Sequence, residues 1–581
     1  MGISGLYGQW LKQKNFNGVI TQNAPQYVSS FCFDFNGLIH KVAGIIYGYS
    51  PDAKTERLEY VKRTSASDLE KEFFLQITSS LMNIISQYKP QDLIILAVDG
   101  VAPQAKIKQQ RQRRYRAAMV RTSDSVFDSN SITPGTDMMR RLDDYMTKWV
   151  KREGYTYNMP KMVIYSGHMC AGEGEHKIMD YIRKGVLNGD GAHFIYGLDA
   201  DLIMLSMLAP LDRIYLMRED TRDIIDIDNL RDAIMLEMQT ESGINDFIFM
   251  MSMVGNDFLP AVPSLKTKRE SIDEMVSAYR NNGEQIIVND VINWNAFKNV
   301  LKGLIKNEES MLIDLSKVKT KYPIEAFSVA FVKDKFDLSA FHLEWYISHL
   351  KPKGNSGYVN IVSKLTNSSL SPAMDESVKN MINQYLTGMA WVYTYYTTGL
   401  INYTYVYEYF FAPLLMDLIE GNIPKKVNYE YSDEIKLYHP FYQLMSVIPP
   451  SSANIMLKEL ASLFGPKSPI FDMFPTHVEV DLQGATYDSE GKTREWEGVV
   501  IVPPVDIDRI ISAINGLSIS QRKYEMFEPK ENVITEKPLE LQIAEREQRI
   551  LIKSIVQNKK NRDKKEKEWD RNGWMAAHLL F

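Results

Sequence analysis

The chain has 581 residues, of which 45% are apolar, 24% charged and 11% aromatic, a composition that predicts a globular protein and excludes a fibrous or low-complexity chain. Its 67 Lys and Arg against 73 Asp and Glu give a net charge of −6, so a polyanionic partner has to be bound by a local basic patch. The only two cysteines, Cys32 and Cys170, exclude a disulfide framework and a four-cysteine zinc site, and they favour a reducing compartment.

Two targeting signals are missing from the sequence. It has no run of eighteen apolar residues, and its start lacks the basic and then apolar pattern of a secretory signal. We therefore expect a cytoplasmic protein without a membrane span. A nuclear location is the alternative, because lysines and arginines are frequent in the charged stretch after residue 542.

Short apolar runs alternate with helix-length segments from residue 28 to about residue 265. The runs predict buried strands at residues 30–34, 92–99, 161–166, 193–198 and 213–217. This alternation is typical of an α/β layer on a largely parallel sheet, where ligands bind beyond the carboxyl ends of the strands. We expect a catalytic α/β domain over residues 1–265, a second mixed α+β lobe that completes the site over 266–515, and a charged C-terminal tail over 516–581.

Carboxylates end or follow three of these predicted strands, and others stand at a predicted helix start and after an apolar helix. The set is Asp34, Asp99, Glu173, Glu175, Asp199, Asp201 and Asp257. Any one of them alone is better explained as a helix cap, a turn residue or a surface charge. Together they would repel one another unless cations neutralised them, and hard oxygen ligands favour Mg²⁺ or Mn²⁺. The pattern predicts a site for two divalent ions.

A basic segment follows the strand that ends near Asp99. Residues 103–121 contain seven Lys and Arg and no acid. On a helix, Lys106, Gln110, Arg113 and Arg114 share one face, which could point toward the ions. Such a face would bind a terminal phosphate or backbone phosphates. The alternative is an ordinary solvated amphipathic helix.

Metal carboxylates beside a phosphate-binding helix are typical of a two-metal phosphodiesterase, and the motifs themselves resemble a known family. The segments 33–40, 99–106, 109–114, 172–177, 197–205 and 255–260 are similar in order and spacing to signature segments of the Xrn-type 5′→3′ exoribonucleases. The likeness covers about residues 1–515. It implies a PIN/flap-nuclease-like fold and a compact member of the family that consists of the catalytic core only.

The resemblance also implies roles for individual residues. It implies that the seven acids hold Mg²⁺ and that Lys106, Gln110, Arg113 and Arg114 form a pocket for a 5′-monophosphate. His40 would stack against the first base of the substrate. The family's Trp-x-Trp falls on Tyr403 and Tyr405, so Tyr405 is the candidate partner of His40.

We therefore expect a Mg²⁺-dependent hydrolase that degrades 5′-monophosphorylated single-stranded RNA processively to 5′-mononucleotides, as in mRNA decay. Its protein partners are not predicted. One alternative is a structure-specific 5′ flap-type DNA nuclease, which shares the carboxylate set. Another is an inactive RNA-binding scaffold, which would need losses among the seven acids, and the sequence has none.

Overall fold

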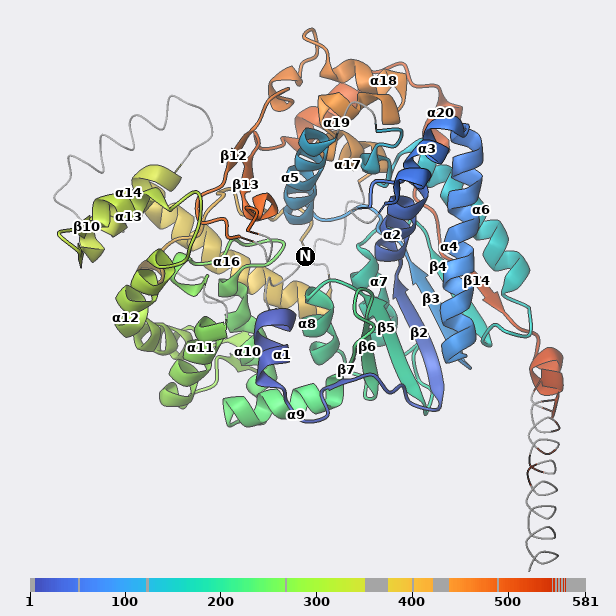
Figure 1. The fold of residues 1–581 in the computed structure, drawn as a ribbon, viewed down its shortest axis with the longest axis horizontal. Coiled ribbons are helices and arrows are strands. Elements are labelled where there is room, and N and C mark those ends of the chain that lie inside the picture. The colour runs from blue at the N-terminus through green and yellow to red at the C-terminus, as the bar shows by residue number, and fades with distance from the viewer. Residues whose placement is uncertain are drawn as a thin grey trace, which may run out of the picture.

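The fold is that of a computed structural model, which describes residues 6–50, 53–121, 125–266, 269–350, 375–399, 402–421, 438–487 and 491–545, with single positions up to 560. Figure 1 shows a sheet covered by helices on one side of the molecule and a helical lobe on the other. Helix α5 (Gln104–Val120) stands between them. A short π-helix, Leu6–Leu11, and α1 (Lys12–Lys14) begin the described chain.

The sheet has eight strands in the order β1-β7-β6-β5-β2-β3-β4-β14. They are β1 (Ile20–Thr21), β2 (Val28–Asp34), β3 (Leu93–Ala97), β4 (Met162–Ser166), β5 (Ala192–Gly197), β6 (Ile214–Arg218), β7 (Ile224–Asp226) and β14 (Val533–Glu536). The five central strands, β6, β5, β2, β3 and β4, are parallel, and β7 and β14 pair antiparallel at the two sides. The predicted α/β class is confirmed, and the five predicted strands lie within two residues of these bounds.

Each face of the sheet is covered by helices, because successive side chains of a strand point to opposite faces. Phe31 and Phe33 pack with one set: α2 (Phe35–Tyr47), α4 (Ala66–Tyr88) and α6 (Asp137–Glu153). Helix α3 (Thr55–Arg63) lies beyond α2. Cys32 packs with the other set: α7 (Gly174–Arg183), α8 (Asp201–Leu208), α9 (Ile227–Met238) and α10 (Gly243–Met251). The carboxyl ends of the parallel strands therefore open between two helical layers.

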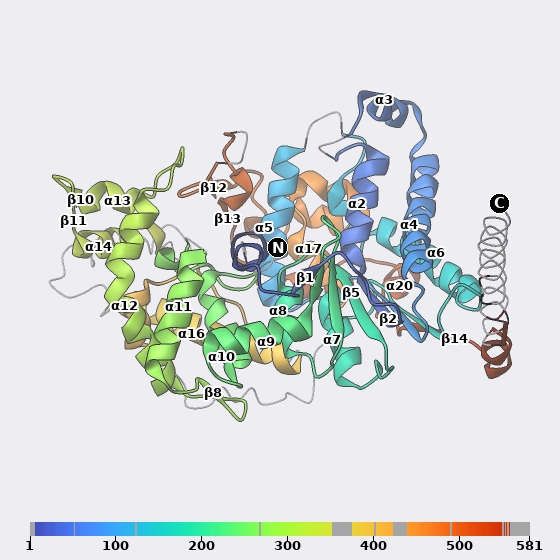
Figure 2. The same ribbon diagram turned by 60° about the horizontal axis from the view of Figure 1, so that its bottom comes forward.

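The helical lobe continues the core of the second layer. Its helices are α11 (Arg269–Asn282), α12 (Trp294–Ser316), α13 (Glu325–Ala330), α14 (Leu338–His349) and α16 (Glu376–Thr398), and its two hairpins are β8–β9 (Ile287–Val288, Val291–Ile292) and β10–β11 (Phe331–Val332, Lys335–Phe336). One buried cluster runs from Cys32 in β2 through Phe249 in α10 to Trp391 in α16. Figures 1 and 2 both show α16 reaching from the lobe toward the sheet. The lobe and the sheet thus share one continuous core.

Helix α5 joins a further group of short elements to the sheet. These are α17 (Pro440–Val447), α18 (Lys458–Ala461), α19 (Ile507–Asn515), α20 (Gln521–Glu525) and the hairpin β12–β13 (Glu479–Asp481, Val499–Ile501). The Arg111 side chain is buried and donates hydrogen bonds to the carbonyl oxygens of Ser446, at 2.7 Å, and Met473. These bonds tie α5 to chain segments more than 300 residues away.

The C-terminal segment differs from the expected charged tail after residue 516. Strand β14 pairs with β4 from Val533–Tyr165 to Glu536–Met162 and extends the sheet. Next to it, the buried Lys537 ammonium donates to both carboxylate oxygens of Glu545, at 2.8 and 2.9 Å. Part of the segment predicted as a tail thus joins the sheet, because β4 supplies hydrogen-bond partners for this short strand. Within the part of the chain that the structure describes, no helix is long and apolar enough to cross a membrane.

Candidate active site

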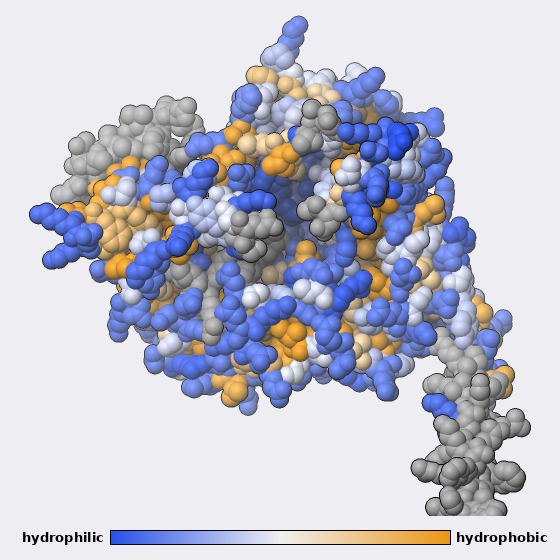
Figure 3. Space-filling view, in the orientation of Figure 1, coloured by the Kyte–Doolittle hydropathy of each residue, from blue (hydrophilic) through white to orange (hydrophobic). Residues whose placement is uncertain are grey.

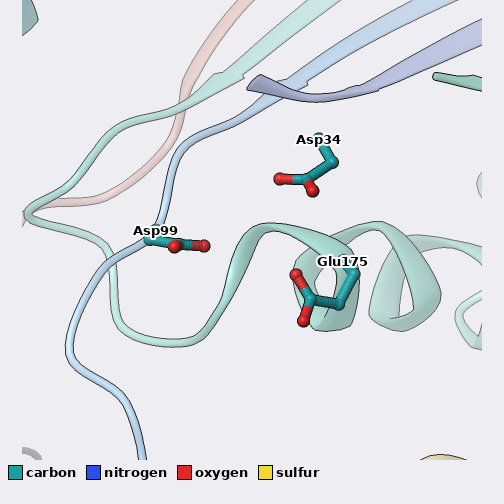
Figure 4. Close-up of side chains that lie close together, drawn as sticks. All are labelled: Asp34, Asp99 and Glu175. Atoms are coloured by element: carbon teal, nitrogen blue, oxygen red, sulfur yellow. The ribbon is translucent and has the colours of Figure 1, made fainter. Parts of the chain in front are cut away.

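Three of the predicted acids meet at the carboxyl edge of the sheet. Asp34 is the last residue of β2, Asp99 follows β3, and Glu175 lies in the first turn of α7. One carboxylate oxygen of each lies within 4.8 Å of one from each of the others. Figure 4 shows the three side chains pointing into the same space. This spacing would let a single cation contact all three.

Lys106 pairs with two of the other four acids and with Glu175. Its ammonium nitrogen is 2.6 Å from Glu173 Oε2, 2.7 Å from Asp257 Oδ2 and 3.7 Å from Glu175 Oε1. Asp201 is the first residue of α8, two positions after Asp199, and the negative charge of Asp257 acts on its carboxylate. Lys106 therefore lies among the carboxylates, whereas its predicted place was with the phosphate-binding residues alone. The Lys106 ammonium neutralises part of the negative charge of these carboxylates, which the sequence pattern alone would leave to metal ions.

Burial and mutual repulsion shift the ionisation of the acids. Burial, followed by the charges of Asp99 and Asp199, raises the pKa of Asp34 well above its usual value. Burial and the charge of Asp257 raise the pKa of Asp201 to about 7. Burial also acts on Asp257, but the positive charges around it, with Lys106 first among them and Arg113 adding to it, together hold the pKa of Asp257 below its usual range. The positive charge around Asp34 and Asp201 is therefore too small to offset the cost of ionising them in a buried site.

The donor set fits a divalent cation. Asp34 Oδ1 and Asp201 Oδ1 are buried and have no hydrogen-bond partner among the described residues, a costly state that a cation would relieve. Gly174 keeps space open beside Asp34, because a Cβ at this position would lie 2.7 Å from Asp34 Oδ1. The Gly174 N–H donates to Asp99 Oδ1 at 2.8 Å. Within the described part of the chain, Asp34, Asp99 and Glu175 form the one group of three whose carboxylate oxygens all lie within 4.8 Å of one another.

A cleft of about 1280 Å³ joins the acids to the basic helix. Its walls include the acids Asp34, Asp99, Glu175 and Asp199 and four residues of α5, which are Lys106, Gln110, Arg113 and Arg114. Figure 3 shows a hollow with hydrophilic walls beside α5. The four residues predicted to share one helix face therefore do so, and that face borders the carboxylates.

Two of the four α5 residues are held in place by the rest of the protein. The Gln443 amide donates to Gln110 Oε1 at 2.9 Å. Arg114 donates to Thr133 Oγ1 at 2.9 Å and to the Ile132 carbonyl at 3.0 Å. Arg113 is exposed. The face thus combines a positioned amide, a positioned guanidinium and a guanidinium open to a ligand.

His40 and Tyr405 are not brought together. His40 projects from α2 into the cleft, and burial, followed by the charges of Arg114 and Arg113, lowers its pKa to about 3, so its ring is neutral near pH 7. Tyr405 stacks on Trp391 with ring centroids 5.2 Å apart and donates to the Gln384 carbonyl at 3.1 Å. It is not among the described residues that line the cleft. Contacts with α16, which the motif alignment does not reveal, determine this position.

Other residues at the site were not predicted. From α16, Tyr395 donates to Glu173 Oε1 at 2.7 Å and stacks on His176 at 3.6 Å between centroids. Glu219 is buried, lines the cleft and follows β6 directly. The rule that carboxylates follow strand ends would have found Glu219. No sequence signal indicates Tyr395, because α16 reaches the site only through tertiary packing.

Comparison with known families accounts for most of the chain. The profile described as "XRN 5'-3' exonuclease N-terminus" matches residues 1–220, and the one described as "Xrn1 helical domain" matches residues 237–335 and 358–580. The chain belongs to the Xrn family. The predicted resemblance is confirmed, and the family match extends beyond residue 515, where the predicted likeness ended.

Curated Xrn relatives are similar over most of this chain. The human protein "5'-3' exoribonuclease 1" is 27% identical over 90% of this chain and 34% of its own length. The protein of that name from Saccharomyces cerevisiae is 25% identical over 83% of this chain and 41% of its own length. The "5'-3' exoribonuclease 2 homolog" of Drosophila melanogaster is 26% identical, over 83% and 65%. The chain thus spans less than half the length of the human and yeast relatives.

Two solved structures resemble parts of the fold weakly. The T5 D15 protein, co-crystallized with metal ions, is 11% identical over 49% of this chain and 86% of that chain, with a TM-score of 0.27. The catalytic core of Rad2 in complex with DNA substrate is 13% identical over 51% and 76%, with a TM-score of 0.30. With TM-scores this low, neither structure identifies residues of the site.

Proposed function

We propose that the protein is a hydrolase that degrades 5′-monophosphorylated single-stranded RNA in the 5′→3′ direction to 5′-mononucleotides. The observation that carries this proposal is that the acid cluster and the basic face of α5 line the same cleft. Membership in the Xrn family and the names of the curated relatives support it. We further propose a cytoplasmic location.

Two divalent ions, Mg²⁺ in the cell, would be held by the carboxylates. Asp34, Asp99 and Glu175 lie close enough to share one ion, and Asp199, Asp201 and Asp257 would have to draw closer together to hold a second. Such ions supply activation of the attacking water and neutralisation of the leaving 3′ oxygen. The acids would position the ions and balance their charge, and none of the acids acts as a nucleophile. Lys106 holds Glu173 and Asp257 in place through its ion pairs with both carboxylates.

The terminal phosphate of the RNA would be bound by the α5 face. A guanidinium can grip phosphate oxygens in two places, and an amide donates a further hydrogen bond. Gln110 and Arg114 are already oriented by Gln443 and Thr133, so little conformational freedom is lost when they bind. Binding the 5′ end here would place the first phosphodiester next to the acids, which accounts for removal of one nucleotide at a time.

His40 would stack against the first base. Its neutral ring lines the same cleft as the acids and the α5 cations. Stacking on an aromatic ring is tolerant of base identity, so it would favour each one-nucleotide advance without selecting a sequence. This property suits processive degradation.

The proposal is tested with three RNAs of one sequence that carry a 5′-monophosphate, a 5′-hydroxyl or a 5′-triphosphate, each incubated with the protein and Mg²⁺. We expect mononucleotides from the 5′-monophosphate RNA at a rate well above that of the other two. A single-stranded DNA and a 5′ flap DNA of the same sequence test the flap-nuclease alternative. Equal cleavage of all three RNAs, or preferred cleavage at the flap junction, would contradict the proposed substrate.

A further inference from the structure

A tyrosine of the helical lobe reaches the acid cluster. Tyr395 of α16 is buried, and its hydroxyl donates to Glu173 Oε1 at 2.7 Å. The two residues lie 222 positions apart in the chain, so the contact joins the lobe to the sheet domain. The roles proposed above for the site residues leave this contact without a function.

The Glu173 carboxylate depends on side chains from other segments for its orientation. Glu173 is the N-cap residue of α7, but its side chain makes no capping hydrogen bond to that helix. A carboxylate at a helix start is commonly stabilised by the N–H groups of the first turn. Here the Tyr395 hydroxyl binds one carboxylate oxygen, and the Lys106 ammonium lies 2.6 Å from the other. Loss of either contact would leave the buried carboxylate free to turn.

Neighbouring rings hold the Tyr395 ring in place. It stacks on His176 of α7 with 3.6 Å between centroids, and the Trp391 and Phe258 rings lie 4.9 and 5.7 Å away. A ring packed on several sides keeps one rotamer, so its hydroxyl stays at one point. Removal of the hydroxyl alone would leave this packing intact.

The Lys106 ammonium contacts three carboxylates at unequal distances. It lies 2.6 Å from Glu173 and 2.7 Å from Asp257, but 3.7 Å from Glu175. Glu175 is also one of the three acids that lie close enough to share a cation. The ammonium and a divalent ion would compete for the Glu175 carboxylate, because the same negative charge attracts both. The position of Lys106 therefore affects how strongly Glu175 can bind an ion.

We propose that Tyr395 is a positioning residue of the ion site. By holding Glu173 as the close partner of Lys106, its hydroxyl keeps the ammonium away from Glu175 and leaves that carboxylate to a divalent ion. This inference rests on the proposed function, since it concerns the ions of that reaction. Tyr395 acts through Glu173 and Lys106 and needs no contact with an ion or with RNA.

The test measures Mn²⁺ binding to the whole chain, without RNA, from the electron paramagnetic resonance signal of free Mn²⁺. Tyr395→Phe removes the hydroxyl and keeps the ring. We expect it to bind Mn²⁺ at least about tenfold more weakly than the wild-type protein, as is typical when a residue that orients a metal ligand is lost.

Tyr393→Phe is the matched control. Tyr393 is buried on the same helix, and its hydroxyl has no hydrogen-bond partner among the described residues. This variant should bind Mn²⁺ within about twofold of wild type, because it removes a hydroxyl that orients no acid. The melting temperatures of both variants show that each is folded.

Two further measurements test the route through Lys106. Beside Lys106→Met no ammonium is left to approach Glu175, so adding Tyr395→Phe should change Mn²⁺ affinity by less than about twofold. In RNA cleavage, Tyr395→Phe alone should need about tenfold more Mg²⁺ and then approach the wild-type rate, because the reacting atoms are untouched. A structural defect would lower the rate at every Mg²⁺ concentration.

Three outcomes would overturn the assignment. They are no Mn²⁺ binding by the wild-type protein, wild-type affinity in Tyr395→Phe, or an undiminished effect of Tyr395→Phe beside Lys106→Met. RNA cleavage by the wild-type protein is measured on the same preparation with Mg²⁺. If it is absent while Tyr395→Phe still weakens Mn²⁺ binding, the proposed function fails and the positioning role stands, so the two failures are distinguishable.

Discussion

The cleft-facing and anchoring sides of helix α5 carry similar residues but have different roles. On the cleft-facing side, Arg113 and Arg114 border the acid cluster. On the anchoring side, Arg111 and Arg116 donate hydrogen bonds to backbone carbonyls of Ser446, Met473 and Gly498. The basic composition of the helix predicts phosphate binding for the whole segment. The structure shows that the basic residues of this helix have two different roles. A buried guanidinium with carbonyl partners on distant segments stabilises the fold and cannot also bind substrate.

The two sides of α5 should respond differently to mutagenesis. Substitution of the exposed Arg113 on the cleft-facing side should change catalysis and leave stability almost unchanged, and substitution of Arg111 on the anchoring side should do the reverse. The acids opposite the cleft-facing side should give the largest catalytic effect.

Replacing Asp201 by Ala should reduce RNA cleavage at saturating Mg²⁺ by at least about a thousandfold, equivalent to about 4 kcal/mol of transition-state stabilisation, because a lost carboxylate empties an ion site. RNA binding should stay within about threefold of wild type, since the α5 face is intact. Both are measured on one preparation, with the exposed Asp232→Ala as the control. Wild-type turnover by Asp201→Ala would mean that the cluster is not the catalytic site.

Arg111→Ala should lower the free energy of unfolding by about 3 kcal/mol or more, because two charge-assisted hydrogen bonds are lost and two carbonyls are left unpaired. Arg113→Ala, on the exposed part of the same helix, should change it by less than about 0.5 kcal/mol. Denaturant unfolding of both variants checks this difference. Equal stability of the two variants would remove the distinction between the two sides of α5.

Arg113→Ala should reduce the preference for 5′-monophosphate over 5′-hydroxyl RNA by about 10- to 100-fold, because a charged hydrogen bond to phosphate contributes roughly 1.5 to 3 kcal/mol. The ratio of the two kcat/KM values is the measurement. Arg121→Ala, at the end of the helix and paired with Asp128, is the control. An unchanged ratio with uniformly weaker binding would mean that the cleft-facing side only follows the RNA backbone.

His40→Ala should shorten processive runs and slow degradation by about 5- to 100-fold, because a stacked base contributes roughly 1 to 3 kcal/mol. Tyr405→Ala should have the smallest catalytic effect, below about threefold, and should instead lower stability, because its ring packs on Trp391. Run length and melting temperature are measured together for both variants. Short runs by a stably folded Tyr405→Ala would restore the predicted pairing of Tyr405 with His40.

Local pattern was sufficient to predict the central strands and the edge of the sheet where the acids meet. Apolar runs with a following carboxylate identify Asp34, Asp99 and Asp199, because in a parallel sheet the carboxyl ends meet at one edge whatever the rest of the chain does. Helical periodicity likewise placed Lys106, Gln110, Arg113 and Arg114 on one face. The same strand-end rule would have added Glu219.

The tertiary structure alone decided the rest. Lys106 lies among the acids, where it pairs with Asp257, 151 residues along the chain, and Arg111 binds the carbonyl of Met473, 362 residues along it. Tyr405 lies against Trp391 of α16. The local sequence pattern carries no record of which segments meet. Strand β14 joins the sheet for the same reason: four residues have too little pattern of their own, and β4 supplies the hydrogen-bond partners. Periodicity specifies which face a side chain occupies, and long-range packing specifies what that face meets.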